Sequence, residues 1–219
     1  SRNQAYDAVP DIVARYMGEL GEITGRQYRP FDYYGDPDAE NIIVAMGSVT
    51  ETIRETIDYL RERGRKYGLV SVHLYRPFSA KYLLKVLPKN VKKIAVLDRT
   101  KEPGALGEPL YQDIKTVFQG VSGAPLIVGG RYGLSSKDTT PAQIIAVYDN
   151  LEQKEPKNDF TIGIVDDVTF KSLPTKSEVS IVKPGTTECK FYGLGSDGTV
   201  GANKNTIKII GTHTDLYSQ

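Results

Sequence analysis

The chain has 219 residues, of which 39% are hydrophobic and 25% charged, and its net charge is +1. This length suits one large domain or one domain with part of another, and the near-zero charge excludes a strong polyanion-binding field, so no nucleic-acid partner is expected. No apolar run approaches the roughly 20 residues that span a bilayer, and no signal-peptide pattern opens the chain. We therefore expect a soluble, cytoplasmic protein that does not contact membranes.

The cysteine and histidine content limits the chemistry of the chain. Cys189 is the single cysteine, and His73 and His213 are the two histidines. These residues cannot supply an internal disulfide, the thiolates of an iron–sulfur cluster or a structural zinc site. No nucleophile motif with a paired histidine is present either. The sequence therefore predicts neither catalytic residues nor a metal site within these 219 residues.

The first 40 residues divide into a helix and a connector. Residues 1–25 carry apolar side chains at helical spacing, and Gly21 and Gly25 end the pattern. Residues 26–40 are aromatic and contain two prolines and paired acids. This composition predicts an extended connector that packs against a neighbour, rather than a regular element.

Strands and helices alternate from Asn41 to Gln153. The run NIIVAMG predicts a strand buried on both faces, and it precedes a helix in which Ser48 and Glu51 form a capping box. Strands are then expected at 67–77, 92–98 and 124–130, and helices at 79–88, 107–120 and 140–153, the last with Thr140 and Gln143 as a second capping box. The pattern predicts an α/β fold whose mostly parallel sheet has helices on both faces.

The composition changes after residue 153. Residues 154–159 are a charged, proline-containing break, and residues 160–188 are β-branched and rich in turns, which predicts a few short strands. An apolar strand, a glycine loop and a helix are expected after residue 189, as the start of a second α/β segment that is not completed. We therefore divide the chain into residues 1–35, 36–153 and 154–219.

The glycine loop YGLGSDGTVGANKN contains a G-x-G-x-x-G spacing. A glycine turn that leads into a helix directs backbone N–H groups and the positive helix end at one point, which stabilises a phosphate. An ordinary surface turn explains the glycines equally well, because a single G-x-G-x-x-G is weak evidence. The candidate phosphate-binding residues are Gly193, Gly195, Ser196, Gly198, Thr199, Asn203 and Lys204.

Three further places at the strand ends have both a structural and a ligand-binding interpretation. Arg76 and Pro77 suit a domain-packing turn, which we favour, or a ligand-facing loop. Ser48 caps a helix or contacts an anion there. Arg99 lies in a charged loop that is typical of a solvated surface, but its guanidinium suits a phosphate or a coenzyme tail, and it is a further candidate for cofactor binding.

Several strings together resemble one family along essentially the whole chain. These strings are VAMGSVTETIRETIDYL, VHLYRPFS, IAVLDRTKEPGALGEPLY, GGRYGLSSKDTTPAQIIAVYDNL and YGLGSDGTVGANKNTIKIIG. They resemble, in this order, pyruvate:ferredoxin (or flavodoxin) oxidoreductases. The resemblance implies that residues 36–153 are a transketolase C-terminal-like domain, that residues 1–35 end the preceding domain, and that residues 154–219 connect to and begin a gamma-like domain.

The resemblance also implies an activity for the parent protein. Members of the family decarboxylate pyruvate on thiamine diphosphate with Mg²⁺, pass electrons through [4Fe–4S] clusters to ferredoxin or flavodoxin, and form acetyl-CoA from coenzyme A. The chain lacks a thiamine-diphosphate motif and a cysteine cluster, so we expect no cofactor in this section and no activity from it alone. Its partners would be the remaining domains, in a homo-oligomeric parent. A scaffold without a ligand site is the alternative, and an independent nucleotide-binding protein is a weaker third interpretation.

Overall fold

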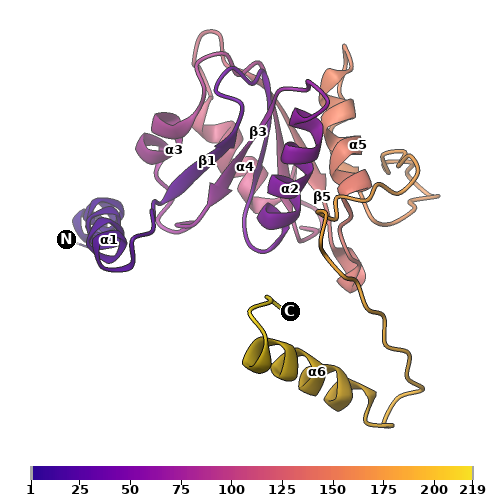
Figure 1. The fold of residues 1–219 in the computed structure, drawn as a ribbon. Coiled ribbons are helices and arrows are strands. Elements are labelled where there is room, and N and C mark those ends of the chain that lie inside the picture. The colour runs from indigo at the N-terminus through magenta and orange to yellow at the C-terminus, as the bar shows by residue number, and fades with distance from the viewer. Residues whose placement is uncertain (1, 219) are drawn as a thin grey trace. The chain divides into compact units, whose positions relative to one another are not determined.

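A computed structural model describes residues 2–218 and contains a six-stranded sheet flanked by helices (Figure 1). The chain divides into two units, Ser1–Ile181 and Val182–Gln219, and each is described by itself. The first unit holds α1 (Arg2–Thr24), β1 (Phe31–Gly35), β2 (Asn41–Ala45), α2 (Val49–Arg61), β3 (Tyr67–Val72), α3 (Ala80–Val86), β4 (Lys93–Asp98), α4 (Pro109–Val117), β5 (Leu126–Arg131), the 3₁₀ turn η1 (Leu134–Ser136), α5 (Pro141–Glu152) and β6 (Phe160–Thr161).

The sheet has the strand order β1-β3-β2-β4-β5-β6. Only β1 runs antiparallel to its neighbour, and the other pairs are parallel. The central strands are continuous apolar runs because both of their faces are covered. The predicted α/β fold with a mostly parallel sheet is therefore confirmed.

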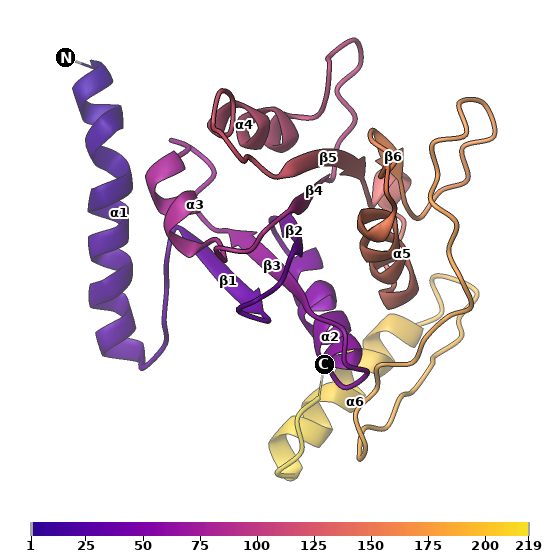
Figure 2. The same cartoon turned by 90° about the horizontal axis from the view of Figure 1, so that it is seen from above.

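Alternate side chains of the strands enter two separate hydrophobic clusters. Ile43, Leu69 and Leu97 lie in the cluster that contains α2 and α5 side chains. Val44 and Val96 lie in the other cluster, together with side chains of α3 and α4. Figure 2 shows the two helix layers on opposite faces of the sheet. Helices on both faces follow from the right-handed parallel crossovers that connect β2, β3, β4 and β5.

The prediction that residues 26–40 form only an irregular connector is wrong at β1. This strand pairs with β3 from Phe31↔Val72 to Gly35↔Gly68. Phe31 is buried while the rest of β1 is partly exposed, as suits an edge strand. The pairing depends on an open edge of β3, which local composition does not reveal.

The two predicted capping boxes have different outcomes. Ser48 has helical backbone angles and its side chain makes no capping hydrogen bond, so the first capping box is wrong. Thr50 Oγ1 instead donates to the Gly47 carbonyl oxygen at 2.7 Å. At α5 the Gln143 side chain accepts a hydrogen bond from the Thr140 backbone N–H at 3.3 Å, as predicted.

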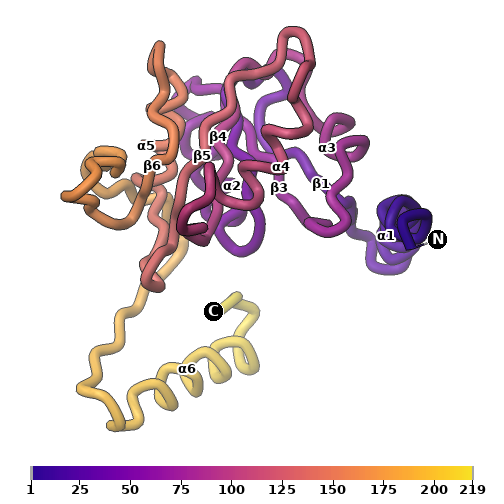
Figure 3. The backbone as a smooth tube through the Cα atoms, turned by 180° about the vertical axis from the view of Figure 1, so that it is seen from behind, coloured from indigo at the N-terminus to yellow at the C-terminus, as the bar shows by residue number. Residues whose placement is uncertain are grey.

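The second unit contains a helix but no strand among its described residues. Residues 182–198 form an extended, irregular run that leads into α6 (Thr199–His213), as the tube in Figure 3 shows. The apolar strand expected before the glycine loop is absent from the described residues of this unit, because no neighbouring segment within the unit supplies ladder hydrogen bonds. The expected strands of residues 160–188 reduce to β6 and a bridge between Thr161 and Ser172.

Candidate functional site

The carboxyl edge of the sheet has a switch in chain direction between β2 and β4. The chain leaves β2 through α2 toward β3 on one side, and leaves β4 through α4 toward β5 on the other. In open α/β sheets, the two loops that diverge at such a point leave a crevice, and ligands bind there. We therefore take this edge as the candidate site.

A pocket of about 290 Å³ lies at this edge and is formed by the start of α2 and the loops after β4 and β5. Tyr132 connects its walls, because its hydroxyl donates to the Met46 carbonyl oxygen at 3.2 Å. Burial raises the pKa of the Tyr132 hydroxyl, and Arg99 opposes this shift. The pocket is lined by Ser48, Val49, Thr52, Arg99, Tyr132, Gly133, Lys137, Asp138 and Thr139.

Arg99 lies across Gly133 in this pocket. A Cβ atom on Gly133 would stand 3.0 Å from Arg99 Nε, and the φ angle of +62° at Gly133 further favours glycine. Neither Arg99 nor Lys137 has a carboxylate partner among the ion pairs of the described residues. Asp138 is the one acidic side chain that lines the pocket. Two exposed cations without an ion pair therefore converge on a polar cavity.

A buried polar cluster fixes the strand ends beside the pocket. Asp98 accepts hydrogen bonds from the N–H groups of Leu110 and Tyr111 at 3.0 and 3.1 Å. Burial raises the pKa of Asp98, although these donors oppose the shift. Arg131 Nη1 lies 3.0 Å from Glu108 Oε1 and 2.6 Å from Asp159 Oδ1. The loops after β4 and β5 are thus attached to α4 and to the segment after α5.

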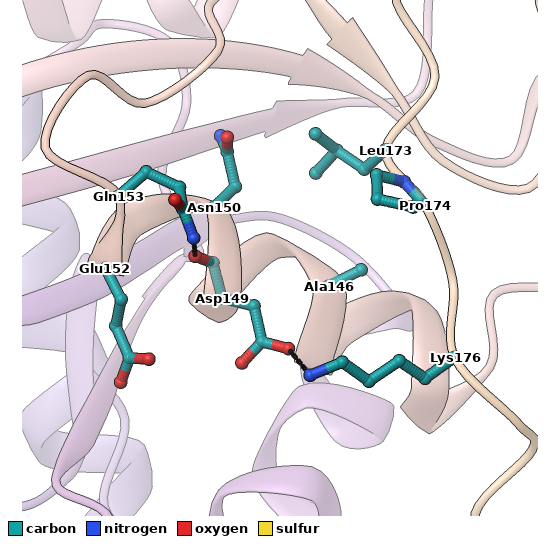
Figure 4. A pocket seen from close by; sticks show the side chains of 8 residues that line it. All are labelled: Ala146, Asp149, Asn150, Glu152, Gln153, Leu173, Pro174 and Lys176. Atoms are coloured by element: carbon teal, nitrogen blue, oxygen red, sulfur yellow. Dashed lines mark hydrogen bonds and ion pairs between the residues drawn. The ribbon is translucent and has the colours of Figure 1, made fainter.

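A second pocket, of about 360 Å³, lies between α5 and the segment 173–176 (Figure 4). Its acidic side chains already have cationic partners. Asp149 pairs with Lys176 at 2.9 Å and with Arg65 at 2.7 Å, and Arg65 also contacts Glu152 at 3.0 Å. The charges in this pocket are therefore already paired. The ion pair between Lys176 and Asp149 attaches the segment after β6 to α5.

Two glycines of the glycine loop have positive φ angles, and backbone N–H groups of the loop are bonded to the loop's own Asp197. Gly195 and Gly198 have φ angles of +90° and +81°. Asp197 accepts hydrogen bonds from the N–H groups of Leu194 at 2.7 Å and Thr199 at 3.0 Å. The Thr199 side chain, followed by these N–H groups, lowers the pKa of Asp197 to about 2.

The sequence predicted part of the pocket at the carboxyl edge of the sheet, which we call the switch-point pocket. Arg99 and Ser48 line it together, whereas the glycine-loop candidates belong to the second unit. Arg76 does not line it and pairs with Asp113 at 2.7 Å. Lys137 was not predicted. The Gly-Gly-Arg-Tyr-Gly string that ends β5 was the available signal, since a glycine turn at the end of a parallel strand marks the same edge.

Comparisons with known proteins agree with the predicted family. Residues 39–144 match the family described as pyruvate:ferredoxin oxidoreductase core domain II. The matched residues run from the residues just before β2 into α5, and so include most of the parallel sheet. The chain is 57% identical over 99% of its length to 19% of the pyruvate-flavodoxin oxidoreductase of Enterobacter agglomerans, and 59% identical over 99% of its length to 18% of the pyruvate:ferredoxin oxidoreductase of Moorella thermoacetica. Over nearly its whole length the chain is therefore similar to pyruvate:ferredoxin and pyruvate-flavodoxin oxidoreductases.

The chain spans about a fifth of the length of these relatives. Among solved structures, a 2-oxoglutarate:ferredoxin oxidoreductase from Magnetococcus marinus is similar over 57% of this chain and 20% of its own, with a TM-score of 0.42 and 20% identity. Residues 2–218 contain no helix that is long and apolar enough to cross a bilayer. The same residues contain no cluster of three or more His, Cys, Asp or Glu side chains arranged to hold a metal ion.

Proposed function

We propose that the chain is a section of an enzyme that converts pyruvate and coenzyme A into acetyl-CoA and CO₂, with ferredoxin or flavodoxin as the electron acceptor. The observation that carries this proposal is identity of 57–59% along nearly the whole chain to relatives with those names. In this proposal residues 36–153 are a transketolase C-terminal-like packing domain, residues 1–35 end the preceding domain, and residues 154–219 connect to a gamma-like domain.

The remaining domains of the polypeptide would supply the cofactors of this reaction. Cys189 is the one cysteine of the chain, and the described residues offer no metal cluster. These residues do not fit a [4Fe–4S] cluster or the Mg²⁺ of thiamine diphosphate, which need grouped thiolate or oxygen ligands. We therefore assign no step through these groups to this chain. The parent is proposed to be a cytoplasmic homo-oligomer.

A contribution to coenzyme A binding is the proposed role of the glycine loop. Lys204 and Asn203 lie in the first turns of α6, just after the loop, and Lys204 is exposed. Backbone donors at a helix start and a nearby cation suit a phosphate group. The carboxylate of Asp197 competes for the same donors, so a phosphate would have to displace it or bind beside it.

Replacing the corresponding segment of the Moorella relative with this chain tests the parent activity. The chimera is expected to retain pyruvate- and coenzyme A-dependent ferredoxin reduction, because 59% identity preserves the packing surfaces of this section. A folded chimera that has its full complement of clusters but no activity would contradict the proposal. The unmodified relative, prepared in parallel, provides the reference rate and cluster content.

Calorimetric titration of the chain with coenzyme A tests the glycine loop. Lys204→Ala should weaken binding roughly tenfold, as expected for loss of one charge-assisted hydrogen bond. Lys208→Ala, one turn further along α6, removes the same charge and should change affinity little. Asp197→Asn should tighten binding, because it removes the competing negative charge. Equal affinities for the three variants would contradict phosphate binding in the loop.

A scaffold without a ligand site is the second candidate, and the hydrogen bonds of Asp197 favour it. A loop whose N–H groups are already satisfied by its own carboxylate is complete as a turn. On this alternative, coenzyme A produces no heat with the chain, and Asp197→Asn destabilises the start of α6 without creating binding.

A further inference from the structure

We propose that the switch-point pocket, defined by Ser48, Thr52, Arg99, Gly133 and Lys137, binds the phosphate group of a small molecule. This inference concerns the first unit and is independent of the glycine loop. It rests on a formed cavity, on the charges that face it and on the absence of internal partners for those charges.

Among the described residues, the two cations of this pocket lack the carboxylate partners that several arginines of the domain have. Arg65, Arg76 and Arg131 each pair with a carboxylate within 3.0 Å. Arg99 and Lys137 have no such partner among the described residues, yet both line the same cavity. Asp138 reduces their combined charge from +2 to +1. A phosphate dianion would supply the missing negative charge.

Gly133 allows the Arg99 side chain to lie in the wall of the pocket. The position where a Cβ would stand is 3.0–3.3 Å from three atoms of Arg99. Any side chain at Gly133 would therefore force the arginine stem to move. The Arg99 stem therefore lies close to Gly133 along the pocket wall, and a guanidinium at that place suits directed donation to a phosphate oxygen.

The start of α2 adds a favourable electrostatic contribution from the opposite wall. Ser48 precedes this 13-residue helix and its hydroxyl makes no capping hydrogen bond. Ser48 and Thr52 both line the pocket, so their hydroxyls are candidate donors to a phosphate oxygen. The positive end of the helix dipole lies on the same side.

The cavity size limits the ligand. A volume of about 290 Å³ is at the small end of ligand sites. This volume accommodates a phosphate with a short organic group, and the rest of a larger ligand would extend out of the open pocket. Two sources of this chemistry are the 3′-phosphate of coenzyme A and a free phosphorylated metabolite. The pocket between α5 and residues 173–176 is not a comparable candidate for anion binding, because its cations are already paired with carboxylates.

Amide shifts of the isotope-labelled chain, titrated with inorganic phosphate against sodium chloride at constant ionic strength, test the proposal. Saturable shifts are expected at Ser48, Thr52 and Gly133. Arg99→Ala should raise the dissociation constant roughly tenfold or more. Lys101→Ala is the matched control, since it removes an equal charge from the same loop outside the pocket, and it should leave the constant within about twofold.

Ser48→Asp separates loss of binding from loss of folding. Aspartate at a helix start stabilises the helix, and its carboxylate should repel phosphate, so the variant should fold and not bind. Displacement of phosphate by coenzyme A but not by dephospho-coenzyme A would identify the 3′-phosphate as the source. Displacement by neither would exclude coenzyme A and favour a free phosphorylated metabolite as the source. Shifts that do not saturate, or equal effects of Arg99→Ala and Lys101→Ala, would overturn the proposal.

Discussion

Replacement of Arg131 with methionine is expected to lower the unfolding free energy of the domain by about 3–5 kcal/mol. The Arg131 and Glu108 side chains are only 6% and 5% exposed, and their charged atoms lie 3.0 Å apart. Methionine fills much of the space of the arginine stem but leaves the Glu108 carboxylate without its cation in a buried site. Most of the expected loss is the cost of that isolated charge.

An exposed ion pair provides the control for this prediction. Lys92 and Glu40 approach to 2.6 Å, closer than Arg131 and Glu108, but their side chains are 66% and 53% exposed. Lys92→Ala should therefore cost less than about 1 kcal/mol. Burial, rather than distance, accounts for the difference between the two pairs.

Urea unfolding followed by far-ultraviolet circular dichroism measures these losses. The double variant Arg131→Met, Glu108→Leu should recover most of the stability, since it removes both charges of the pair. Similar losses for Arg131→Met and Lys92→Ala would refute the reasoning. Failure of the double variant to recover would show that contacts of Arg131 with Asp159 account for the loss.

Three further predictions concern packing, a buried hydroxyl and a titration. Gly130→Ala places a Cβ 2.1 Å from the Phe160 ring, so thermal denaturation should show a loss of about 1–3 kcal/mol, and an unchanged midpoint would contradict it. Tyr148→Phe removes the hydrogen bond to the Gly68 carbonyl oxygen and should cost about 1 kcal/mol in urea; no loss would mean that this oxygen finds another donor. Asp197 stabilises the start of α6 above pH 3.8, and this contribution should vanish as the pH falls through about 2; a side-chain carbon titration with a midpoint near 3.8 would exclude the capping.

The central α/β pattern was predictable because short sequence segments determine each of its strands and helices. Each of β2, β3, β4 and β5 is a short apolar run, and helices with apolar stripes separate them. The strand β1 was not predictable in the same way. Its sequence FDYYG is only partly apolar, and its existence depends on the free edge that β3 presents after the parallel sheet has formed.

The candidate site was predictable only in part for a related reason. Arg99 follows β4, and the rule for sheet edges directs attention to it. Lys137 lines the same pocket only because β5 pairs with β4, which brings the loop after β5 close to the loop after β4. The contacts of Arg131 with Glu108 and Asp159 span 23 and 28 residues, and no local spacing encodes them.

The position of β2 between β3 and β4 has a consequence for biosynthesis. One edge of β2 can pair with β3 soon after α2 forms, but the other edge waits for β4, which is synthesised about 50 residues after β2. At roughly 5–20 residues per second, that edge stays open for about 2–10 s on the ribosome. The segment NIIVA, which is uncharged and apolar after Asn41, is therefore exposed to other nascent chains during this interval. A chaperone bound to this segment before β4 emerges would prevent its pairing with other chains.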